Sequence, residues 1–578
     1  MSTKSTTPET GNPTSTLQRG KACLRCRKRK MRCDGAKPAC QQCTRAKKPD
    51  ACEYDDGKGK TRTQILRESI TRLEQRIREL EDPEYTSPSV TLFDPHAEHR
   101  RSYSSSSSVA DSQGSGLSLT NSPFPSESPN SPHGSWIGIP SPSPSPFREA
   151  YHDDMRPPFE LAQMLLEIFL PHRHQCGLEV HIGRMRDSLT LPPSQQRHPI
   201  LMNAIFLWSC YVSRPGPLSQ HESHYLSRAL EGLNDALQYP DKIIDVIQGS
   251  CLLSMYFLSN GRVLEGSYHA NAAASLSVQW GLHGGISNAP NLGFSDPISS
   301  CKLEPPRDAI EAGERILAFW QVFNLDRCWS VILHKPSVIP DTQSGFTSIN
   351  TPWPLAMGEY ESGHMDEGRN FQTIQTFFEG QGSNLVGGFS TLALRVKASA
   401  LIERANQLSM NWDHRLAPST AFTDDFQNLE HTITRFVPTL IPVQQLDATT
   451  PQNKHAFLTN HTLAHAAIIH LYYPFGTEDP TSYEKCLRAA RSIVTVIKHI
   501  SEVDFDFLDP IIGPCWVVAA DTLIRELDGI EVSWPLMNTG DIRTEIGTIL
   551  YAMTSLNTRF PLLNFSVAKV QKRLADMI

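Results

Sequence analysis

The sequence lacks the long apolar runs that direct secretion or cross a membrane. Residues 1–19 are polar and rich in Ser and Thr, without the apolar core of a secretory signal. The longest apolar stretch, Pro199–Val212, is interrupted by Asn203 and Ser209, and it falls short of the roughly 20 residues that a spanning helix needs. We therefore expect a protein that is not exported and has no membrane partner, with this stretch as a buried helix.

The common enzyme motifs are also missing. The sequence has no G-x-S-x-G nucleophile turn and no glycine-rich dinucleotide fingerprint, and His221 and His224 are too close for a zinc-protease helix. Gly59-Lys60-Thr61 is similar to the end of a phosphate-binding loop, but Tyr54 replaces its first glycine. We expect no catalytic residues. An enzyme whose basic N-terminal segment serves only as a tether remains an alternative.

Net charge is small but unevenly distributed. The 578 residues include 54 Lys and Arg and 61 Asp and Glu, a net charge of −7. Residues 1–82 hold 20 Lys and Arg against 11 Asp and Glu, or +9, which leaves −16 for residues 83–578. A basic head on an acidic body indicates that the head meets a polyanion.

Six of the 13 cysteines are clustered, in the spacing C-x2-C-x6-C-x6-C-x2-C-x8-C. Thiols that stay reduced at such intervals indicate metal binding, and two tetrahedral zinc ions need eight ligand positions. Six sulfurs fill eight positions when two of them bridge both ions. The repeat favours Cys23 and Cys40, the first cysteine of each half, as these bridges. The expected ligands are Cys23, Cys26, Cys33, Cys40, Cys43 and Cys52.

An all-sulfur shell leaves no open coordination position, so the two expected zinc ions are structural. Two independent zinc sites would need more ligands, and the nearest histidine is His96. The other seven cysteines are scattered and are expected in the core, with one redox sensor left open: Cys176, Cys210, Cys251, Cys301, Cys328, Cys486 and Cys515.

A run of cations lies between the second and third clustered cysteines. We predict a helix of about two turns here, with some cations on phosphates and others on base edges in the major groove. The same run has the composition of a nuclear import signal, so we expect a nuclear protein. The alternative is a scaffold that binds RNA or other polyanions without sequence preference, which the scarcity of aromatic residues in 19–53 disfavours. The candidate DNA-binding residues are Lys21, Arg25, Arg27, Lys28, Arg29, Lys30 and Arg32.

Residues 22–34, the Lys37-Pro38 step and the Cys52-Glu53-Tyr54 ending resemble the fungal binuclear zinc-cluster transcription factors. The resemblance implies that Arg29 and Lys30 face the bases of CGG-like triplets, and that Pro38 lies in the loop between the half-motifs, often after a cis bond. The second half-motif is less basic, and we expect it to pack or to touch phosphate.

Residues 57–82 contain a heptad pattern that ends at Pro83. Ile at a and Leu at d favour a parallel two-stranded coil, so we expect a homodimer that binds two half-sites. A helix that packs on its own chain is the alternative, because the pattern is short. The seam residues are Leu66, Ile70, Leu73, Ile77 and Leu80.

Composition divides the rest of the chain. Residues 83–148 include 19 Ser and 11 Pro, too polar to offset the entropy of ordering. The expected domains are a disordered tail (1–18), the zinc cluster (19–56), a bridge with the coiled coil (57–82), a disordered linker (83–156) and an all-helical body (157–578). The fold class is therefore mostly α.

Within the body, residues 308–333 give the clearest helical pattern, with an aromatic face expected in the core and a Glu311–Arg315 pair. Residues 198–205, 260–269 and 315–327 resemble the regulatory middle-homology domain of the same fungal family. The resemblance implies an activity-modulating domain with co-regulators and a small-molecule effector. Where many members have Gly-Arg-Pro, this chain has His334-Lys335-Pro336. Residues 504–509 mix acidic and aromatic side chains as activation segments do, but a loop is expected there.

Overall fold

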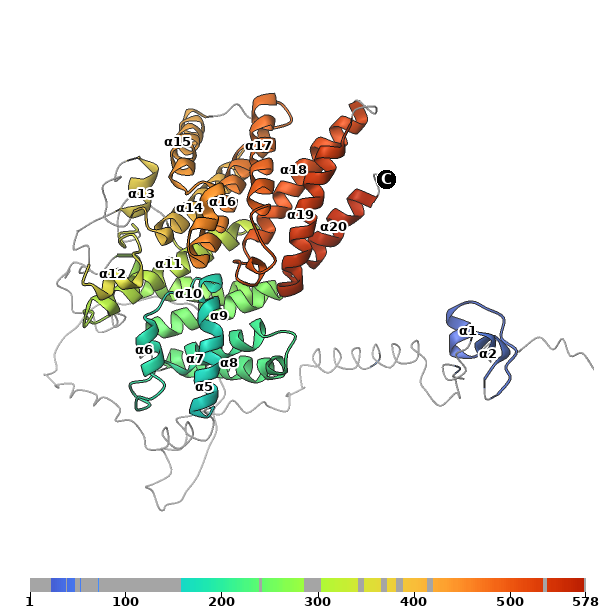
Figure 1. Cartoon of the computed structure of the whole chain (residues 1–578), viewed down its shortest axis with the longest axis horizontal. Coiled ribbons are helices and arrows are strands. Elements are labelled where there is room, and N and C mark those ends of the chain that lie inside the picture. The colour runs from blue at the N-terminus through green and yellow to red at the C-terminus, as the bar shows by residue number, and fades with distance from the viewer. Residues whose placement is uncertain are drawn as a thin grey trace, which may run out of the picture. The chain divides into compact units, whose positions relative to one another are not determined.

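The computed structural model describes residues 22–37, 39–46, 52, 71, 157–238, 242–284, 303–340, 348–364, 372–380, 388–412, 419–533 and 538–575. The chain divides into two compact units, Met1–Ile137 and Gly138–Ile578. Every regular element of the described residues is a helix, which confirms the mostly α fold (Figure 1). The predicted tail and linker, Lys21 and the five seam residues of the coiled coil lie outside the described residues.

The described part of the first unit, the head, contains two short helices, α1 (Leu24–Lys28) and α2 (Gln41–Arg45). Its buried side chains are those of Cys23, Cys26, Cys40, Cys43 and Cys52. Only Cys33 and Ala39 pack against them as partly buried apolar residues. A unit with so small an apolar core depends on a metal for its stability.

The second unit, the body, begins with helices packed around α7 (Pro199–Val212), which contacts α5, α8 and α9 (Figure 1). Pro199 occupies the first turn of α7, where its missing N–H costs no hydrogen bond, and the His198 ring accepts a bond from the Ile200 N–H at 3.2 Å. The predicted buried helix is confirmed. The other helices of this half are α5 (Phe159–Phe169), α6 (Ile182–Asp187), α8 (Glu222–Gln238), α9 (Ile243–Ser259) and α10 (Val263–Gln279).

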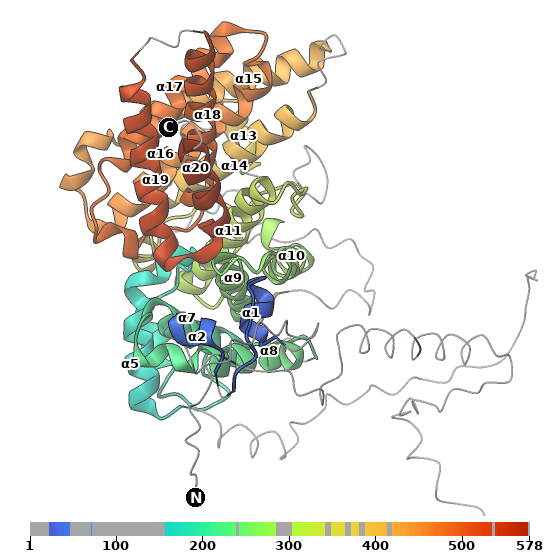
Figure 2. The same ribbon diagram turned by 90° about the vertical axis from the view of Figure 1, so that its right-hand side faces the viewer.

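The long helix α11 (Ala309–Ile332) joins the two halves of the body, because it contacts α9 and α10 on one side and α14 (Thr391–Met410) on the other (Figures 1 and 2). It begins at Asp308, whose carboxylate caps the Glu311 N–H at 2.9 Å. Trp320 is 2% exposed, and its indole N–H donates to the Pro352 carbonyl at 2.7 Å. The predicted helix, its buried aromatic face and the Glu311–Arg315 pair are confirmed.

The C-terminal half continues from α14 through a series of packed neighbours, α14 with α16, α16 with α17, α17 with α18, and α18 with α19. Figures 1 and 2 show these helices, in orange and red, beyond α11. The bounds are α12 (Met357–Glu361), α13 (Thr373–Phe378), α15 (Thr420–Phe436), α16 (Pro451–Tyr472), α17 (Pro480–Ile497), α18 (Ile512–Ser533), α19 (Gly540–Arg559) and α20 (Asn564–Ala575). None of the described helices is long and apolar enough to span a membrane.

The turn after α11 contains His334 at the position where the family resemblance led us to expect a glycine. His334 adopts a left-handed conformation with φ of 51°, while the Lys335 N–H bonds back to the Ser330 carbonyl at 2.9 Å. Beyond the turn, the Asp326 carboxylate accepts bonds from the Val338 and Ile339 N–H groups at 2.8 and 3.0 Å. The buried carboxylate holds the chain in place, so a residue other than glycine is tolerated at the strained position.

Residues 504–509 form a short 3-10 turn, Asp504–Asp506, between α17 and α18, as the loop prediction required. Phe505 and Leu508 are buried in it. Six of the seven scattered cysteines are buried in the body, as expected, and Cys301 lies outside the described residues. Burial raises the pKa of thiols such as Cys251 well above the ordinary value, which leaves them unreactive.

Candidate metal centre and basic surface

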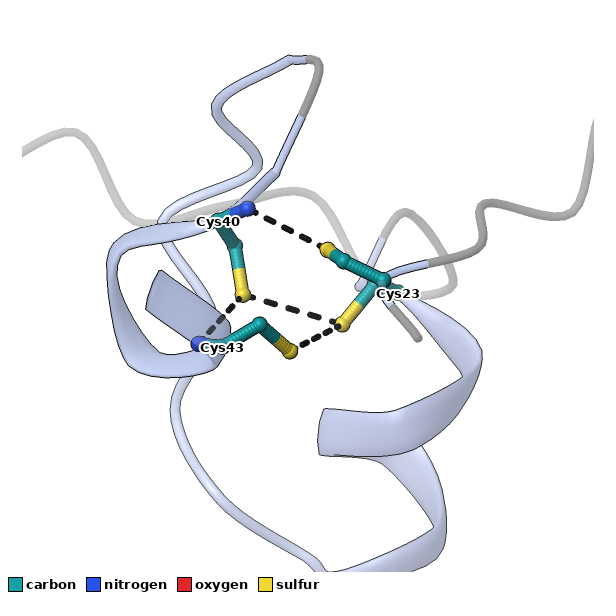
Figure 3. Close-up of side chains that lie close together, drawn as sticks. Cys23, Cys40 and Cys43 are labelled. Carbon is teal, nitrogen blue, oxygen red and sulfur yellow. Dashed lines mark hydrogen bonds between the residues drawn. The ribbon is translucent and has the colours of Figure 1, made fainter. Parts of the chain in front are cut away.

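Each half of the cysteine motif folds in the same way. Cys23 is the N-cap of α1, and its sulfur accepts the Cys26 N–H at 3.4 Å. Cys40 is the N-cap of α2, and its sulfur accepts the Cys43 N–H at 3.4 Å (Figure 3). A C-x2-C pair at the start of a helix therefore points two sulfurs to the same side of one turn. The sequence repeat is a structural repeat.

The two halves bring their sulfurs together. The Cys23 sulfur lies 3.7 Å from that of Cys40 and 3.8 Å from that of Cys43 (Figure 3), and the Cys26 sulfur lies 3.7 Å from that of Cys40. Sulfurs on a tetrahedral zinc ion at about 2.3 Å are separated by about 3.8 Å. The separations in the head therefore fit ligands that share an ion.

The sulfurs form two overlapping groups of four, and within each group all ligand atoms lie within 4.8 Å of one another. One group is Cys23, Cys26, Cys33 and Cys40, and the other is Cys23, Cys40, Cys43 and Cys52. Cys23 and Cys40 belong to both groups. Two four-coordinate sites with two shared members use all six cysteines, which is the donor set that two zinc ions require.

The environment of the sulfurs also fits a metal centre. Five of the six side chains are buried, and Cys33 is partly buried. Burial raises the pKa of Cys23 to about 12 and also raises that of Cys40, because a lone thiolate is poorly solvated there. Zinc is bound by the thiolate form, and the positive charge of two ions stabilises the ionised sulfurs.

The segment between the two helices is held by a contact that the sequence analysis did not identify. The Asp34 carboxylate accepts the Gln41 N–H at 3.0 and 3.2 Å for its two oxygens. This places a negative charge at the N-terminus of α2, where the free N–H groups favour it. Asp34 lies seven residues before Gln41, outside the usual capping spacing, so no local signal reveals this role.

The basic surface differs from the predicted two-turn helix. Helix α1 ends at Lys28, Arg29 is its C-cap, and Lys30 adopts a left-handed φ of 52°. The Met31 N–H then bonds to the Cys26 carbonyl at 3.0 Å, which closes the helix. The prediction of two turns was wrong, because the chain has to leave the helix for Cys33 to reach the sulfur cluster.

The structure nevertheless groups the predicted cations on one short segment. Arg27, Lys28, Arg29, Lys30 and Arg32 are all exposed, and Arg25 is partly buried. Met31, which interrupts the run, is 41% exposed. The second half-motif offers Arg45, exposed at the end of α2. Exposed cations beside a fixed metal cluster form a rigid surface that can meet phosphates and base edges.

Comparison with known families identifies two regions of the chain. Residues 21–61 match the fungal Zn(2)-Cys(6) binuclear cluster domain, and residues 167–373 match the fungal specific transcription factor domain. The first match covers all six clustered cysteines, and a domain of this kind binds two zinc ions. The predicted cofactor is thereby confirmed.

Curated relatives match over short segments. A protein named Transcription factor FBD3 is 40% identical over 74 residues in Gibberella moniliformis and 39% identical over 75 residues in Fusarium pseudograminearum, in each case 13% of this chain and 10% of the relative. The Chromatin structure-remodeling complex protein RSC30 of Saccharomyces cerevisiae is 59% identical over 39 residues, 7% of this chain and 4% of the relative.

The match thus spans about a tenth or less of the length of these relatives. No solved structure matches the chain significantly. Both resemblances seen in the sequence are borne out by family matches, one in each compact unit. The chain therefore combines a segment that matches the fungal Zn(2)-Cys(6) binuclear cluster domain with a segment that matches the fungal specific transcription factor domain.

Proposed function

We propose that the chain is a zinc-dependent, sequence-specific DNA-binding regulator of RNA polymerase II transcription that acts in the nucleus. One observation carries the proposal: five exposed cations lie on the six residues that follow Cys26, directly beside a cluster of six cysteines. A fixed array of cations fits the phosphate backbone of a duplex, and Arg and Lys pair with guanine acceptors in the major groove.

The metal scheme of the proposal assigns all six cysteines to two zinc ions. Cys23 and Cys40 bridge the ions, because only these two belong to both groups of sulfurs. Cys26 and Cys33 complete one tetrahedron, and Cys43 and Cys52 complete the other. The zinc ions hold α1, α2 and the connecting segment together, so the cations depend on the metal for their placement.

Within the basic surface we assign two roles. Arg29 and Lys30 read bases of CGG-like triplets, as the family resemblance implies, and both lie at the end of α1 with exposed side chains. Lys21, Arg25, Arg27, Lys28 and Arg32 neutralise phosphates. The head is then positioned by the phosphate contacts and made specific by two side chains.

The proposal also includes a homodimer. Leu66, Ile70, Leu73, Ile77 and Leu80 form the seam of a parallel coil, and two heads on one coil select two half-sites at a fixed spacing. Co-regulators of transcription are the expected protein partners of the body.

Random-site selection with the full zinc-loaded chain tests the proposal. We expect enrichment of paired CGG-like triplets at one spacing. Enrichment of single triplets would remove the homodimer and keep the DNA-binding function. Binding without enrichment that collapses as salt rises would contradict sequence-specific recognition and favour a general polyanion scaffold. Substrate turnover by the body without the head would instead support the enzyme alternative.

Two variants separate base contacts from phosphate contacts. We expect Lys30→Ala to weaken binding to the selected site by about 1–3 kcal/mol and to relax specificity at one base. Arg45→Ala, at an exposed cation of the second half-motif, is the matched control and should weaken all sequences alike. Equal and sequence-independent losses for both variants would make Lys30 a phosphate contact.

A further inference from the structure

The body contains a cavity of about 460 Å³ between α11, α14 and α16. Helix α16 runs from its mouth to its floor: Gln452 and Asn453 are exposed, His455 and Ala456 are partly buried, and Asn460 is fully buried. The α11 wall contributes Trp320 and Gln321, and Val396 of α14 is also fully buried. A cavity of this volume has the size of a small-molecule site.

Polar side-chain atoms in this cavity have no partner among the described residues. Asn460 is 0% exposed, yet both its amide oxygen and its amide nitrogen are unpartnered. Gln321 is 5% exposed, and its Oε1 is unpartnered while its Nε2 donates to the Cys176 carbonyl at 3.0 Å. Because an unsatisfied buried polar atom costs about 1–3 kcal/mol, a cluster of them calls for a bound group.

The orientation of these groups defines what a ligand must offer. The bond to Cys176 fixes Gln321 with its oxygen as the free atom, and the Oδ1 of Asn324, one turn further along α11, is also unpartnered. The Nδ1 of His174 bonds to the Glu179 carboxylate and its Nε2 is unpartnered, while the Nε of Arg173 is an unpartnered donor in the same lining. Three amide oxygens, those of Gln321, Asn324 and Asn460, therefore lack a donor, and the ligand must supply N–H or O–H groups to them.

The charges in the lining argue against an ionic ligand. The lining includes two arginines and three carboxylates, and Arg395 is paired with Asp509 at 2.8 Å. Glu361 lies 3.1 Å from the His181 ring. The lining therefore has no excess positive charge for an anion. A cation would find no unpartnered carboxylate, because Glu179 bonds to His174 and the other two carboxylates are paired as described.

We infer that this cavity binds a compact neutral molecule with an apolar or planar body and at least two N–H or O–H donors. Trp320, Phe507 and Leu317 supply the apolar contacts, and Gln321, Asn324 and Asn460 receive and orient the polar edge. Binding takes place within the body and does not depend on the DNA contacts of the head.

Three probes of one shape test the charge requirement: neutral benzamide, anionic benzoate and cationic benzamidine. Saturation-transfer NMR with the full zinc-loaded chain measures each dissociation constant. We expect benzamide to bind in the millimolar range, and each charged probe to bind at least about tenfold more weakly, because the lining has no net positive charge and its carboxylates already have partners. Absence of benzamide binding would overturn the inference and leave a cavity that holds water only. Tighter binding of either charged probe would overturn the requirement for a neutral ligand and with it the inference.

Two variants of cavity residues and one control variant test whether benzamide binds in the cavity. Asn460→Leu removes the unpartnered amide at nearly constant volume, and Ala456→Phe fills the space one turn above it. Both should weaken benzamide binding by about tenfold or more, and the second keeps every polar group of the floor. The matched control is Gln248→Met on α9, because Gln248 is also fully buried with both amide atoms unpartnered but lines none of the described cavities.

The inference requires unchanged benzamide binding in Gln248→Met. Circular dichroism and urea midpoints of all three variants establish that the body remains folded. Should Asn460→Leu and Ala456→Phe both fold and bind benzamide as tightly as the unaltered chain, the probe binds elsewhere and the inference is wrong.

Discussion

Replacement of a bridging cysteine should remove more zinc than replacement of a terminal one. Cys40→Ala takes one sulfur from each group of four, because Cys40 belongs to both. Cys52→Ala takes one sulfur from a single group and leaves Cys23, Cys26, Cys33 and Cys40 intact. The two variants remove the same atoms from the same small unit, so Cys52→Ala is the matched control.

The structure sets the expected magnitude. Apart from its cysteines, the described head packs only Ala39 against its core, so apolar burial contributes little to its stability. Structural zinc contributes about 10–16 kcal/mol to small domains of this kind. Loss of one ligand from both ions should therefore unfold the head, whereas Cys52→Ala keeps one complete four-sulfur site.

Metal analysis of the purified full chains measures the outcome. We expect two zinc ions per chain for the unaltered protein, at least one for Cys52→Ala and fewer than one for Cys40→Ala, with DNA binding abolished in the last. Equal zinc content in the two variants would refute the shared-ligand scheme. A Cys40→Ala chain that still binds two ions and its DNA site would refute it more directly.

Three further variants test features of the backbone and the core. Lys30→Gly should stabilise the zinc-loaded head by about 1 kcal/mol by relieving the left-handed strain, yet weaken binding to the selected DNA site as Lys30→Ala does; DNA affinity equal to that of the unaltered chain would contradict the base contact. His334→Gly should raise the urea stability of the body by about 1 kcal/mol for the same backbone reason, and a loss of stability would show that the imidazole makes a larger contribution. Burial lowers the pKa of Lys397 from 10.5 to about 8, so the unfolded chain binds more protons between these values and stability should rise with pH across that window. Across this window the free energy of unfolding should rise by about 3 kcal/mol in the unaltered chain, and Lys397→Met should flatten the rise. Urea titrations at pH 7.5 and 10 measure both values; the same rise in the variant would contradict the lowered pKa of Lys397.

The sequence predicts those features that depend on residues close to one another in the chain. The cysteine cluster spans residues 23–52, so its spacing alone reveals a metal site and its two-fold repeat. Helix α11 combines an Asp308 cap with apolar residues at helical spacing, two local signals that agree. For such elements the folded chain adds little that the pattern does not already contain.

The features that escape prediction depend on contacts between distant residues. The left-handed turn at Lys30 carries no glycine and is imposed by the return of Cys33 to the sulfur cluster. The cavity of the body joins Gln321 and Asn460, which are 139 positions apart, and buried amides make no periodic pattern. Only the packing of α11 against α14 and α16 brings them to one place.

The acidic and aromatic segment 504–509 also shows that composition alone does not reveal the partners of its side chains. Its three carboxylates have partners within the body: Asp504 bonds to the His455 ring at 2.9 Å, Asp506 pairs with Arg559 at 2.6 Å, and Asp509 pairs with Arg395 at 2.8 Å.

Phe507 stacks between the rings of His172 and His455, at 4.7 and 5.6 Å between centroids, and it lines the cavity. In this structure the acidic and aromatic residues of the segment therefore make internal contacts. They connect α14, α16 and α19 to one wall of the cavity. Because partly buried contacts of this kind are costly to break, the segment holds Phe507 and its side of the cavity in place.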